Sequence, residues 1–211
     1  SAAVSPELRE KMGHAAVTAA KAAGYVNAGT IEFLLEPDGK FWFMEMNTRI
    51  QVEHPVTEWV TGIDLVKEQL KIASGMPLEI SQEDVRIQGH AIECRINAEN
   101  PQKNFRPSPG TIQGAHFPGG NGIRVDTCVY NGCKIPPYYD SMLAKLIVHA
   151  GNRKEAIAKM QSALGEVIID GIDTNIDYQY EILKDEDYQS GNFDTGFLAS
   201  HIIAGVKINE N

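Results

Sequence analysis

Five polar side chains of this chain occupy every second position in one short stretch. Within MEMNTRIQVEHP they come in the order Glu45, Asn47, Arg49, Gln51 and Glu53. An arginine presents a planar fork of donors that can bind a small oxyanion, an amide can assist it, and a nearby glutamate can remove a proton from the bound molecule. The same alternation of polar and apolar residues is typical of an exposed edge strand, and the pattern alone leaves both interpretations open.

Two acidic residues lie among aromatic and aliphatic neighbours in the run GTIEFLLEPDGKFWFMEMN. The two apolar segments around Pro-Asp-Gly have the composition of a β-hairpin, and we expect that hairpin to be buried on both sides. If PDGK forms a four-residue loop, Glu36 faces Phe41 and Glu32 faces Glu45 on one side of the sheet. A slip of one residue would place Glu32 and Glu45 on opposite faces.

Carboxylates in an apolar hairpin require a cationic partner, because an unpaired buried charge is costly. One candidate is Mg²⁺ or Mn²⁺, since hard cations take oxygen ligands and Asn47 could add a carbonyl oxygen to those of Glu32 and Glu45. The alternative is a set of structural salt bridges to lysine or arginine. A cation, a base and an oxyanion fork so close in the sequence suit phosphoryl transfer to a small carboxylate.

Helices flank the hairpin in the sequence. A first helix is expected to begin after Ser5, which can cap its free amides, with Pro6 in the first turn and Gly24 at its end. A second is expected from Asp64 to residue 74, because apolar residues recur there at helical spacing after a capping acid. A change to polar residues then predicts a boundary near Val85, giving two units, residues 1–85 and 86–211.

The second unit shows strand-like runs separated by turn residues, followed by two helices with a short strand and a last short helix. In GHAIECRINAE, alternation predicts that Ile92, Cys94 and Ile96 point inward while Arg95 points outward, toward the cleft that also holds Arg49. FPGGNG, at residues 117–122, predicts a hairpin turn. The fold class expected for the whole chain is α+β, with an antiparallel second unit.

Composition excludes several classes of protein. The 211 residues carry a net charge of -9, so neither nucleic acid nor an anionic membrane surface is an expected partner. No apolar run approaches the roughly 20 residues that a membrane-spanning helix needs. The three cysteines have no CxxC spacing, which favours a reduced cytoplasmic location.

Several motifs together carry a resemblance to a known family. MEMNTRIQVEHPVTE, with GTIEFL before it and GHAIECRINAE, PSPGTI and PPYYDSMLAKLI after it, resembles the biotin carboxylase component of biotin-dependent carboxylases. The likeness extends over nearly all of the chain and is strongest to the stand-alone bacterial subunit of acetyl-CoA carboxylase. It implies the C-terminal part of an ATP-grasp domain in residues 1–85, followed in residues 86–211 by the β-rich C-terminal domain with flanking helices.

The resemblance also implies roles for residues of the hairpin. Glu32 and Glu45 would hold the Mg²⁺ or Mn²⁺ ions that bridge the phosphates of ATP, with Asn47 beside them. Leu34, on the same strand as Glu32, would lie against the nucleotide.

Bicarbonate and biotin would be bound further along the chain. Arg49, Gln51 and the backbone amide of Val52 would bind bicarbonate, and Glu53 would deprotonate it for attack on the γ-phosphate of ATP. The carboxyphosphate formed would break down to CO₂ and phosphate. Arg95 would then stabilise the biotin enolate that attacks CO₂.

The resemblance implies partners and raises alternatives. The parent enzyme would be a homodimer working with a biotin carboxyl carrier protein and carboxyltransferase subunits in fatty acid synthesis. This chain lacks the glycine-rich ATP lid of the family, so the chain alone is expected to be inactive. The same motifs would serve a segment of pyruvate, propionyl-CoA or urea carboxylase, and a non-catalytic self-association module is a further alternative.

Overall fold

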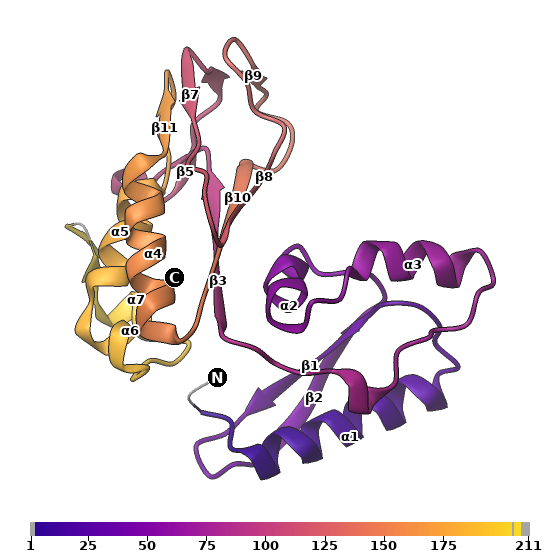
Figure 1. The fold of residues 1–211 in the computed structure, drawn as a ribbon. Coiled ribbons are helices and arrows are strands. Elements are labelled where there is room, and N and C mark those ends of the chain that lie inside the picture. Colours follow the sequence, from indigo (N-terminus) through magenta and orange to yellow (C-terminus); the bar gives the residue numbers. More distant parts are fainter. Residues whose placement is uncertain (1–2, 204, 208–211) are drawn as a thin grey trace. The chain divides into compact units, whose positions relative to one another are not determined.

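The computed structural model describes residues 3–203 and 205–207 and divides the chain into two compact units. Unit 1 extends to Arg86 and unit 2 begins at Ile87, one residue beyond the boundary that the sequence predicts. Both units combine helices with antiparallel strands, which confirms the α+β class (Figure 1). None of the described helices is long and apolar enough to cross a membrane.

Unit 1 consists of a two-stranded hairpin and three helices. Its elements are α1 (Pro6–Ala22), β1 (Thr30–Leu35), β2 (Phe41–Asn47), α2 (His54–Thr61) and α3 (Leu65–Ala73), followed by a 3-10 turn at Gln82–Asp84. The predicted caps are present: the Ser5 side chain accepts a hydrogen bond from the Leu8 amide at 3.2 Å, and that of Asp64 accepts one from the Lys67 amide at 2.8 Å. The first and second predicted helices are therefore confirmed.

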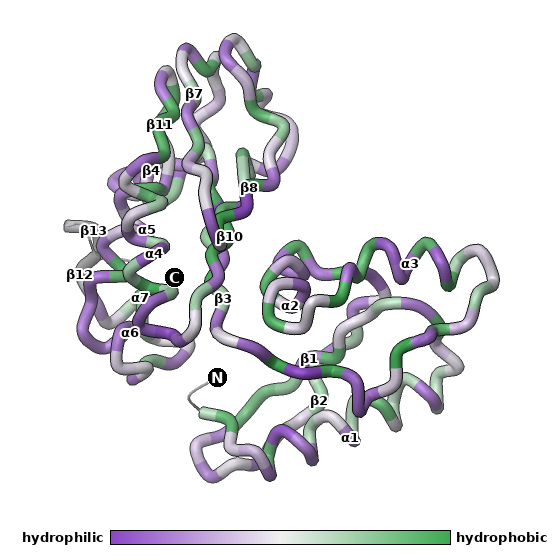
Figure 2. Tube along the Cα trace, viewed as in Figure 1, coloured by the Kyte–Doolittle hydropathy of each residue, from purple (hydrophilic) through white to green (hydrophobic). Residues whose placement is uncertain are grey.

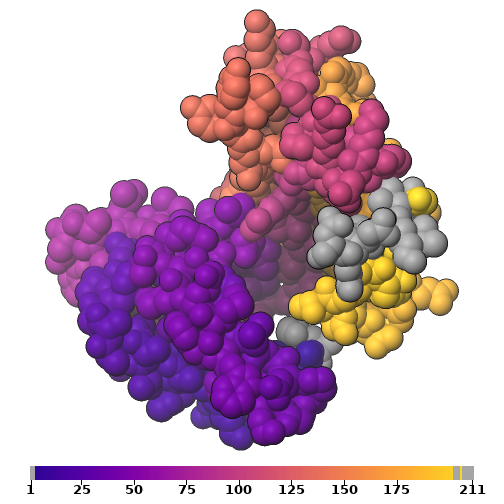
Figure 3. Space-filling view, turned by 180° about the vertical axis from the view of Figure 1, so that it is seen from behind, coloured from indigo at the N-terminus to yellow at the C-terminus, as the bar shows by residue number. Residues whose placement is uncertain are grey.

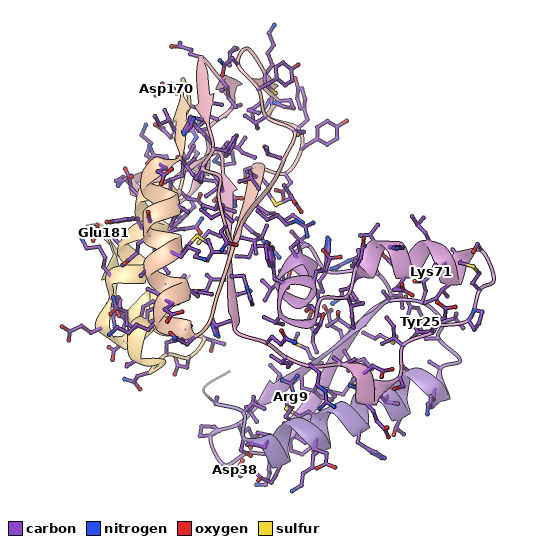
Figure 4. All side chains as sticks on the ribbon, viewed as in Figure 1. Arg9, Tyr25, Asp38, Lys71, Asp170 and Glu181 are labelled. Carbon is purple, nitrogen blue, oxygen red and sulfur yellow. The ribbon has the colours of Figure 1, made fainter. Side chains whose placement is uncertain are left out.

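The register of the hairpin differs from the expected one near the turn. Leu35, and not Glu36, pairs with Phe41, so the loop consists of the five residues 36–40 and is one residue longer than PDGK; Asp38 lies at its tip (Figure 4). The register then shifts between Glu32 and Phe33, where Met44 is the extra residue on β2. This bulge restores the predicted pairing of Glu32 with Glu45 on one face.

The expectation that both faces of the hairpin are buried is wrong. Leu34, Trp42 and Phe43 are 59%, 57% and 60% exposed. A groove between α1 and β1 is lined by Ile31 and Phe33, and alternation along β1 puts Leu34 on the opposite face. The hairpin therefore has one face toward α1 and leaves several large apolar side chains exposed. In Figure 3, which is coloured by residue number, unit 1 is indigo to purple.

The described residues of unit 2 form two long strands, several short strands and four helices. Its strands are β3 (His90–Asn97), β4 (Glu99–Asn100), β5 (Arg106–Pro107), β6 (Gly110–Thr111), β7 (Gly114–His116), β8 (Ile123–Thr127), β9 (Lys134–Ile135), β10 (Met142–Ala150), β11 (Ile168–Asp170), β12 (Ile202–Ile203) and β13 (Val206–Lys207). Its helices are α4 (Arg153–Glu166), α5 (Ile176–Lys184), α6 (Glu186–Ser190) and α7 (Phe197–Ser200). The predicted pair of helices with a short strand is α4, β11 and α5.

The core of unit 2 lies between its largest sheet and α4. The sheet has the order β3-β10-β8, and α4 packs against β10 and β3 (Figure 1). Leu146 on β10 and Met160 on α4 are both fully buried and belong to one apolar cluster. Figure 2 shows the hydrophobic residues of β10 in the middle of this unit. Each such side chain stabilises the fold by about 1.5–3 kcal/mol through burial.

The glycine-rich residues 117–122 do not form a hairpin turn, contrary to expectation. They connect β7 to β8, but β7 pairs with β11 and β8 pairs with β10. Gly122 has a φ of +74°, and a Cβ atom there would lie 2.6 Å from the carbonyl oxygen of His149. This glycine is required by close packing where the chain passes from one sheet to another.

Candidate functional site

The two acidic residues of the hairpin are joined by one amide. Glu32 on β1 and Glu45 on β2 are direct cross-strand partners, and Asn47 lies two residues beyond Glu45 on the same face. Asn47 Nδ2 donates hydrogen bonds to Glu32 Oε1 at 2.7 Å and to Glu45 Oε1 at 3.1 Å. One side-chain amide thus holds an oxygen of each carboxylate in place.

Arg49 and Gln51 extend this cluster beyond the end of β2. Arg49 Nη2 donates to Asn47 Oδ1 at 3.1 Å, and Arg49 Nη1 donates to the Ile50 carbonyl at 3.2 Å. Gln51 Nε2 lies 3.4 Å from Glu32 Oε1, a long hydrogen bond. Five of the predicted site residues therefore form one hydrogen-bonded group, which we call the hairpin cluster: Glu32, Glu45, Asn47, Arg49 and Gln51.

The structural salt bridges of the alternative interpretation do not form within the part of the chain that the structure describes. Among the residues that the structure describes, neither Glu32 nor Glu45 forms an ion pair with a lysine or arginine. Arg49 bonds to Asn47 instead of closing on the acids. The site fits a hard divalent cation, because half a turn of the Asn47 amide would direct a third oxygen toward the two carboxylates.

The edge-strand interpretation of RIQVE is also wrong. The chain turns at Val52 and Glu53, and helix α2 begins at His54 with Pro55 in its first turn. His54 Nδ1 lies 2.8 Å from the Gln51 carbonyl oxygen, which tightens this turn. Glu53 is the exposed N-cap residue of α2, and its carboxylate makes no capping hydrogen bond to the helix.

Close packing at the start of β1 involves the backbone carbonyl of Asn47. A Cβ atom on Gly29 would lie 2.9 Å from Cε1 of Tyr25 and 3.1 Å from the Asn47 carbonyl oxygen. The Tyr25 hydroxyl is fixed by donating to the Ala28 carbonyl at 2.7 Å. Only glycine leaves room for this approach, so Gly29 helps set the position of the backbone that carries Asn47.

Leu34 lies on the same face of β1 as Glu32 and is paired with Trp42. Its exposure makes it available to an apolar ligand. Trp42 Nε1 donates to Glu36 Oε1 at 2.9 Å, so the indole is held beside Leu34.

Arg95 belongs to unit 2, whereas the hairpin cluster belongs to unit 1. The predicted alternation along β3 is confirmed: Ile92, Cys94 and Ile96 are at most 8% exposed, and the Arg95 side chain is 47% exposed. Arg95 Nε lies 3.9 Å from Glu93 Oε1 on the same face of the strand.

Charged residues continue from Arg95 across the sheet. Lys145 on β10 is the direct partner of Arg95, and on its other side it pairs with Asp126 on β8. Lys145 Nζ lies 3.3 Å from Asp126 Oδ2, and Arg124 donates two hydrogen bonds to the same carboxylate at 2.7 and 2.9 Å. Burial opposes ionisation of Asp126, but these two cations hold the pKa of its carboxyl below the usual value.

Two residues that the sequence did not indicate contact the backbone of Arg95. Asn175 and Gln179, at and beyond the start of α5, both donate side-chain hydrogen bonds to the Arg95 carbonyl oxygen. They follow Arg95 by 80 and 84 residues, and no local pattern connects such distant positions.

Comparison with known families assigns both units. Residues 93–200 match the biotin carboxylase C-terminal domain, and residues 1–81 match the carbamoyl-phosphate synthase L chain, ATP binding domain. The chain belongs to the biotin carboxylase family. Biotin carboxylase 1 of Bacillus subtilis is 57% identical over 206 residues, and a pyruvate carboxylase subunit of Methanothermobacter thermautotrophicus is 56% identical over 195.

The match covers only part of these relatives. It includes 97% and 92% of this chain but 46% and 40% of the two proteins, so the chain spans less than half of their length. Among solved biotin carboxylase structures, the domain dimer of Hydrogenobacter thermophilus 2-oxoglutarate carboxylase, in complex with MgADP, ADP and bicarbonate, has a TM-score of 0.90 at 52% identity. That match covers 93% of this chain and 43% of the solved chain.

Proposed function

We propose that this chain forms the C-terminal part of a biotin carboxylase, which uses ATP and bicarbonate to carboxylate biotin on a carrier protein. The observation that carries the proposal is the hairpin cluster, in a chain of this family. It brings two carboxylates that lack lysine or arginine partners among the described residues next to an amide, a guanidinium and a second amide. The relative solved with MgADP and bicarbonate supports the same pair of ligands here.

Bicarbonate would be bound by the end of the hairpin. The Arg49 guanidinium, the Gln51 amide and the backbone amide of Val52 would hold its oxygens, and the exposed carboxylate of Glu53 would take its proton. The resulting carbonate oxygen would attack the γ-phosphorus of ATP, forming carboxyphosphate and releasing ADP. To bind the anion, Arg49 would exchange its present bond to Asn47 for bonds to bicarbonate.

Glu32, Glu45 and Asn47 would hold the divalent cation, Mg²⁺ or Mn²⁺. The ion, when bound, neutralises charge on the phosphates of ATP. The protein's contribution is to keep the two carboxylates on one face of the hairpin at a fixed separation, which the bulge at Met44 achieves. Leu34, on the same face, would offer an apolar contact to the nucleotide.

Arg95 would act on the second substrate. Carboxyphosphate would break down to CO₂ and phosphate, and the phosphate would take the ureido proton of biotin. The outward-facing guanidinium of Arg95 would stabilise the enolate oxygen of biotin while its nitrogen attacks CO₂.

The molecule that finally receives the carboxyl group, acetyl-CoA or pyruvate, distinguishes two candidates for the parent enzyme. We propose acetyl-CoA carboxylase, active in the cytoplasm in fatty acid synthesis, as a homodimer with a biotin carboxyl carrier protein and carboxyltransferase subunits. Pyruvate carboxylase is the second candidate, because the Methanothermobacter protein is almost as similar as the Bacillus protein, at 56% and 57% identity. Reconstitution with each set of carrier and transferase subunits, supplied with acetyl-CoA or pyruvate, separates them.

We expect the 211-residue chain by itself to fold but not to turn over ATP. Phosphoryl transfer depends on positioning and on neutralising charge, and this chain supplies only the two acids and Asn47 toward the phosphates. Bicarbonate-dependent ADP release by the purified chain would contradict this expectation.

The decisive test is bicarbonate-dependent ATP hydrolysis by a full-length biotin carboxylase that contains this segment. Glu53→Gln keeps the size of the side chain and removes the base, so we expect a loss on the order of 10²–10⁴-fold. Glu79→Gln, on a highly exposed side chain of the same unit, is the matched control. Near-normal hydrolysis by Glu53→Gln, at unchanged stability, would refute the assignment.

The cation site has a test that does not depend on activity. In the same full-length protein, Mn²⁺ binding in the presence of ATP can be followed by electron paramagnetic resonance. Glu32→Gln and Glu45→Gln should each weaken Mn²⁺ binding, whereas Glu79→Gln should leave it unchanged. Equal affinity in the parent protein and all three variants would show that the acids do not hold the ion.

A further inference from the structure

Strand β3 lies at the edge of its sheet, and α5 contacts this strand. At Arg95 the strand's carbonyl oxygen accepts two side-chain hydrogen bonds from α5 and its N-cap. Asn175 Nδ2 donates at 3.1 Å and Gln179 Nε2 donates at 2.6 Å. Both acceptor sites of this one carbonyl are therefore occupied by amides from a single helix.

Asn175 makes further bonds two residues along the strand. Its Oδ1 accepts a hydrogen bond from the Asn97 amide at 2.9 Å, and its own backbone amide donates to the Asn97 carbonyl at 3.2 Å. The residue is 8% exposed. Its side chain spans the positions where a neighbouring strand would bond to Arg95 and Asn97.

These contacts fix the peptide groups on the C-terminal side of Arg95. A peptide plane that cannot rotate fixes the direction of the Cα–Cβ bond, and the guanidinium is several bonds further out. A small rotation of the backbone would thus move the guanidinium by a larger distance. On the strand itself, Arg95 Nε lies 3.9 Å from Oε1 of Glu93, whose side chain is 4% exposed.

We propose that Asn175 and Gln179 are positioning residues for biotin carboxylation, holding the backbone of Arg95 so that its guanidinium meets the biotin enolate. This inference rests on the proposed function, in which Arg95 contacts biotin. In this role neither residue contacts the substrate. Both act through the backbone of β3, Gln179 at the Arg95 carbonyl and Asn175 at Arg95 and Asn97.

A purely structural role predicts something different. If the amides only cover the free edge of β3, their loss lowers the free energy of unfolding and leaves the kinetics of the folded protein unchanged. If they position Arg95, their loss changes the reaction with biotin and spares the hydrolysis of ATP that needs only bicarbonate.

The test uses Gln179→Met in a full-length biotin carboxylase that contains this segment. Methionine keeps the length of the side chain and removes the donor, and Gln179 is only partly buried, so the fold should survive. Gln161→Met is the matched control, since Gln161 Nε2 donates in the same way to the Leu183 carbonyl at 3.1 Å, away from Arg95. Two assays are compared: carboxylation of free biotin, and bicarbonate-dependent ATP hydrolysis without biotin.

We expect kcat/KM for biotin to fall about tenfold in Gln179→Met, with ATP hydrolysis in the absence of biotin changed by less than about twofold. Asn175→Asp keeps the acceptor for the Asn97 amide but loses the donor to the Arg95 carbonyl. It should likewise lower kcat/KM for biotin while leaving ATP hydrolysis without biotin nearly unchanged. The control should retain both activities.

An unchanged kcat/KM for biotin in Gln179→Met, or an equal loss in both assays, would overturn the positioning role. Arg95→Ala is measured alongside to keep the two claims separate. If Arg95→Ala loses biotin carboxylation while Gln179→Met does not, the proposed function stands and the positioning role fails. If Arg95→Ala carboxylates biotin normally, the role of Arg95 itself is wrong.

Discussion

The two units of the chain bury their apolar side chains to different extents. Every buried hydrophobic residue of the described core, from Ala91 to Phe197, belongs to unit 2. In unit 1 only Pro55 is buried among the described residues, and helices α1 and α3 contain no buried residue. Unit 2 thus holds Arg95 on a packed sheet, whereas unit 1 holds the hairpin cluster on a hairpin with one open apolar face.

Different interactions therefore hold the two sets of functional residues in place. The hairpin cluster depends on hydrogen bonds among its own members, because the described residues of unit 1 provide no buried core other than Pro55. Arg95 depends on a core and on amides from α5. We therefore expect unit 1 to be the less stable part of this chain.

The largest expected effect comes from the core of unit 2. Leu146→Ala removes a fully buried side chain and should lower the free energy of unfolding by about 2–5 kcal/mol. Leu70→Ala in unit 1, where the side chain is 68% exposed, should cost less than about 0.5 kcal/mol. Urea unfolding followed by circular dichroism measures both, and equal losses would abolish the contrast between the units.

A glycine in each unit gives a second comparison. Gly171 has a φ of +100°, and a Cβ atom there would lie 2.4 Å from the Thr111 carbonyl oxygen. Gly75 has a φ of +86° with open space around it. Gly75→Ala should cost about 1 kcal/mol from backbone strain, and Gly171→Ala more, up to about 3 kcal/mol. If Gly171→Ala loses less unfolding free energy than Gly75→Ala, the backbone around Gly171 shifts to make room for the added Cβ atom.

Thiol reactivity reports on unit 2 directly. Burial, with a smaller effect of Glu93, raises the pKa of the Cys94 thiol to about 12, whereas Cys128 is exposed. At pH 8 the thiolate fraction of Cys94 is then on the order of one in ten thousand. Mass spectrometry after iodoacetamide treatment should find Cys128 modified long before Cys94. Rapid modification of Cys94 without denaturant would mean that the core opens.

The smallest effect is expected at a surface pair of unit 2. His201 Nε2 lies 3.1 Å from Asp187 Oδ2; this bond, together with the Phe197 carbonyl, raises the pKa of His201 above 6.5. Hydrogen bonds from Asn192 and His201 lower the pKa of Asp187. The stabilising effect of His201 is complete below pH 6.5 and is lost as the pH rises through its folded pKa. The stabilising effect of Asp187 is lost as the pH falls through the folded pKa of Asp187.

Proton NMR of the histidine ring measures this pair. Asp187→Asn should lower the pKa of His201 toward its ordinary value. Asp185, which also acts on the ring, remains in that variant, so a small elevation should persist. An unchanged pKa of His201 in Asp187→Asn would show that the pair does not form in solution.

Several features could be predicted from sequence because local physics decides them. Ser5 and Asp64 cap their helices wherever the rest of the chain lies. Alternation along β3 separated Arg95 from Cys94 because a sheet with one buried face imposes that period. The family of the chain followed from motifs whose residues each lie within one short stretch.

Other features depend on contacts that no local pattern encodes. The bulge at Met44 compensates for a turn that is one residue longer than expected, so the pairing of Glu32 with Glu45 was predicted for a register that is wrong near the loop. Exposure of Leu34 and Trp42 depends on which segments cover the hairpin, and composition cannot specify that. Asn175 and Gln179 reach Arg95 across 80 and 84 residues, and only tertiary packing brings them together.

Because Trp42 and Trp59 are the two tryptophans and both lie in unit 1, their fluorescence reports on this unit alone. Alkylation of Cys94 at increasing urea concentrations reports on unit 2. The tryptophan transition should come at a lower urea concentration than exposure of Cys94. Coincident transitions would mean that the two units unfold together and that the packing contrast has no thermodynamic consequence.

A crystal structure of a full-length protein that contains this segment, solved with MgADP and bicarbonate, shows whether Arg49 and Gln51 bind the anion. We expect the anion within hydrogen-bonding distance of Arg49 and Gln51, with the guanidinium released from Asn47 and the carboxylate of Glu53 beside the anion. Bicarbonate bound elsewhere, with the Arg49–Asn47 bond intact, would contradict this expectation.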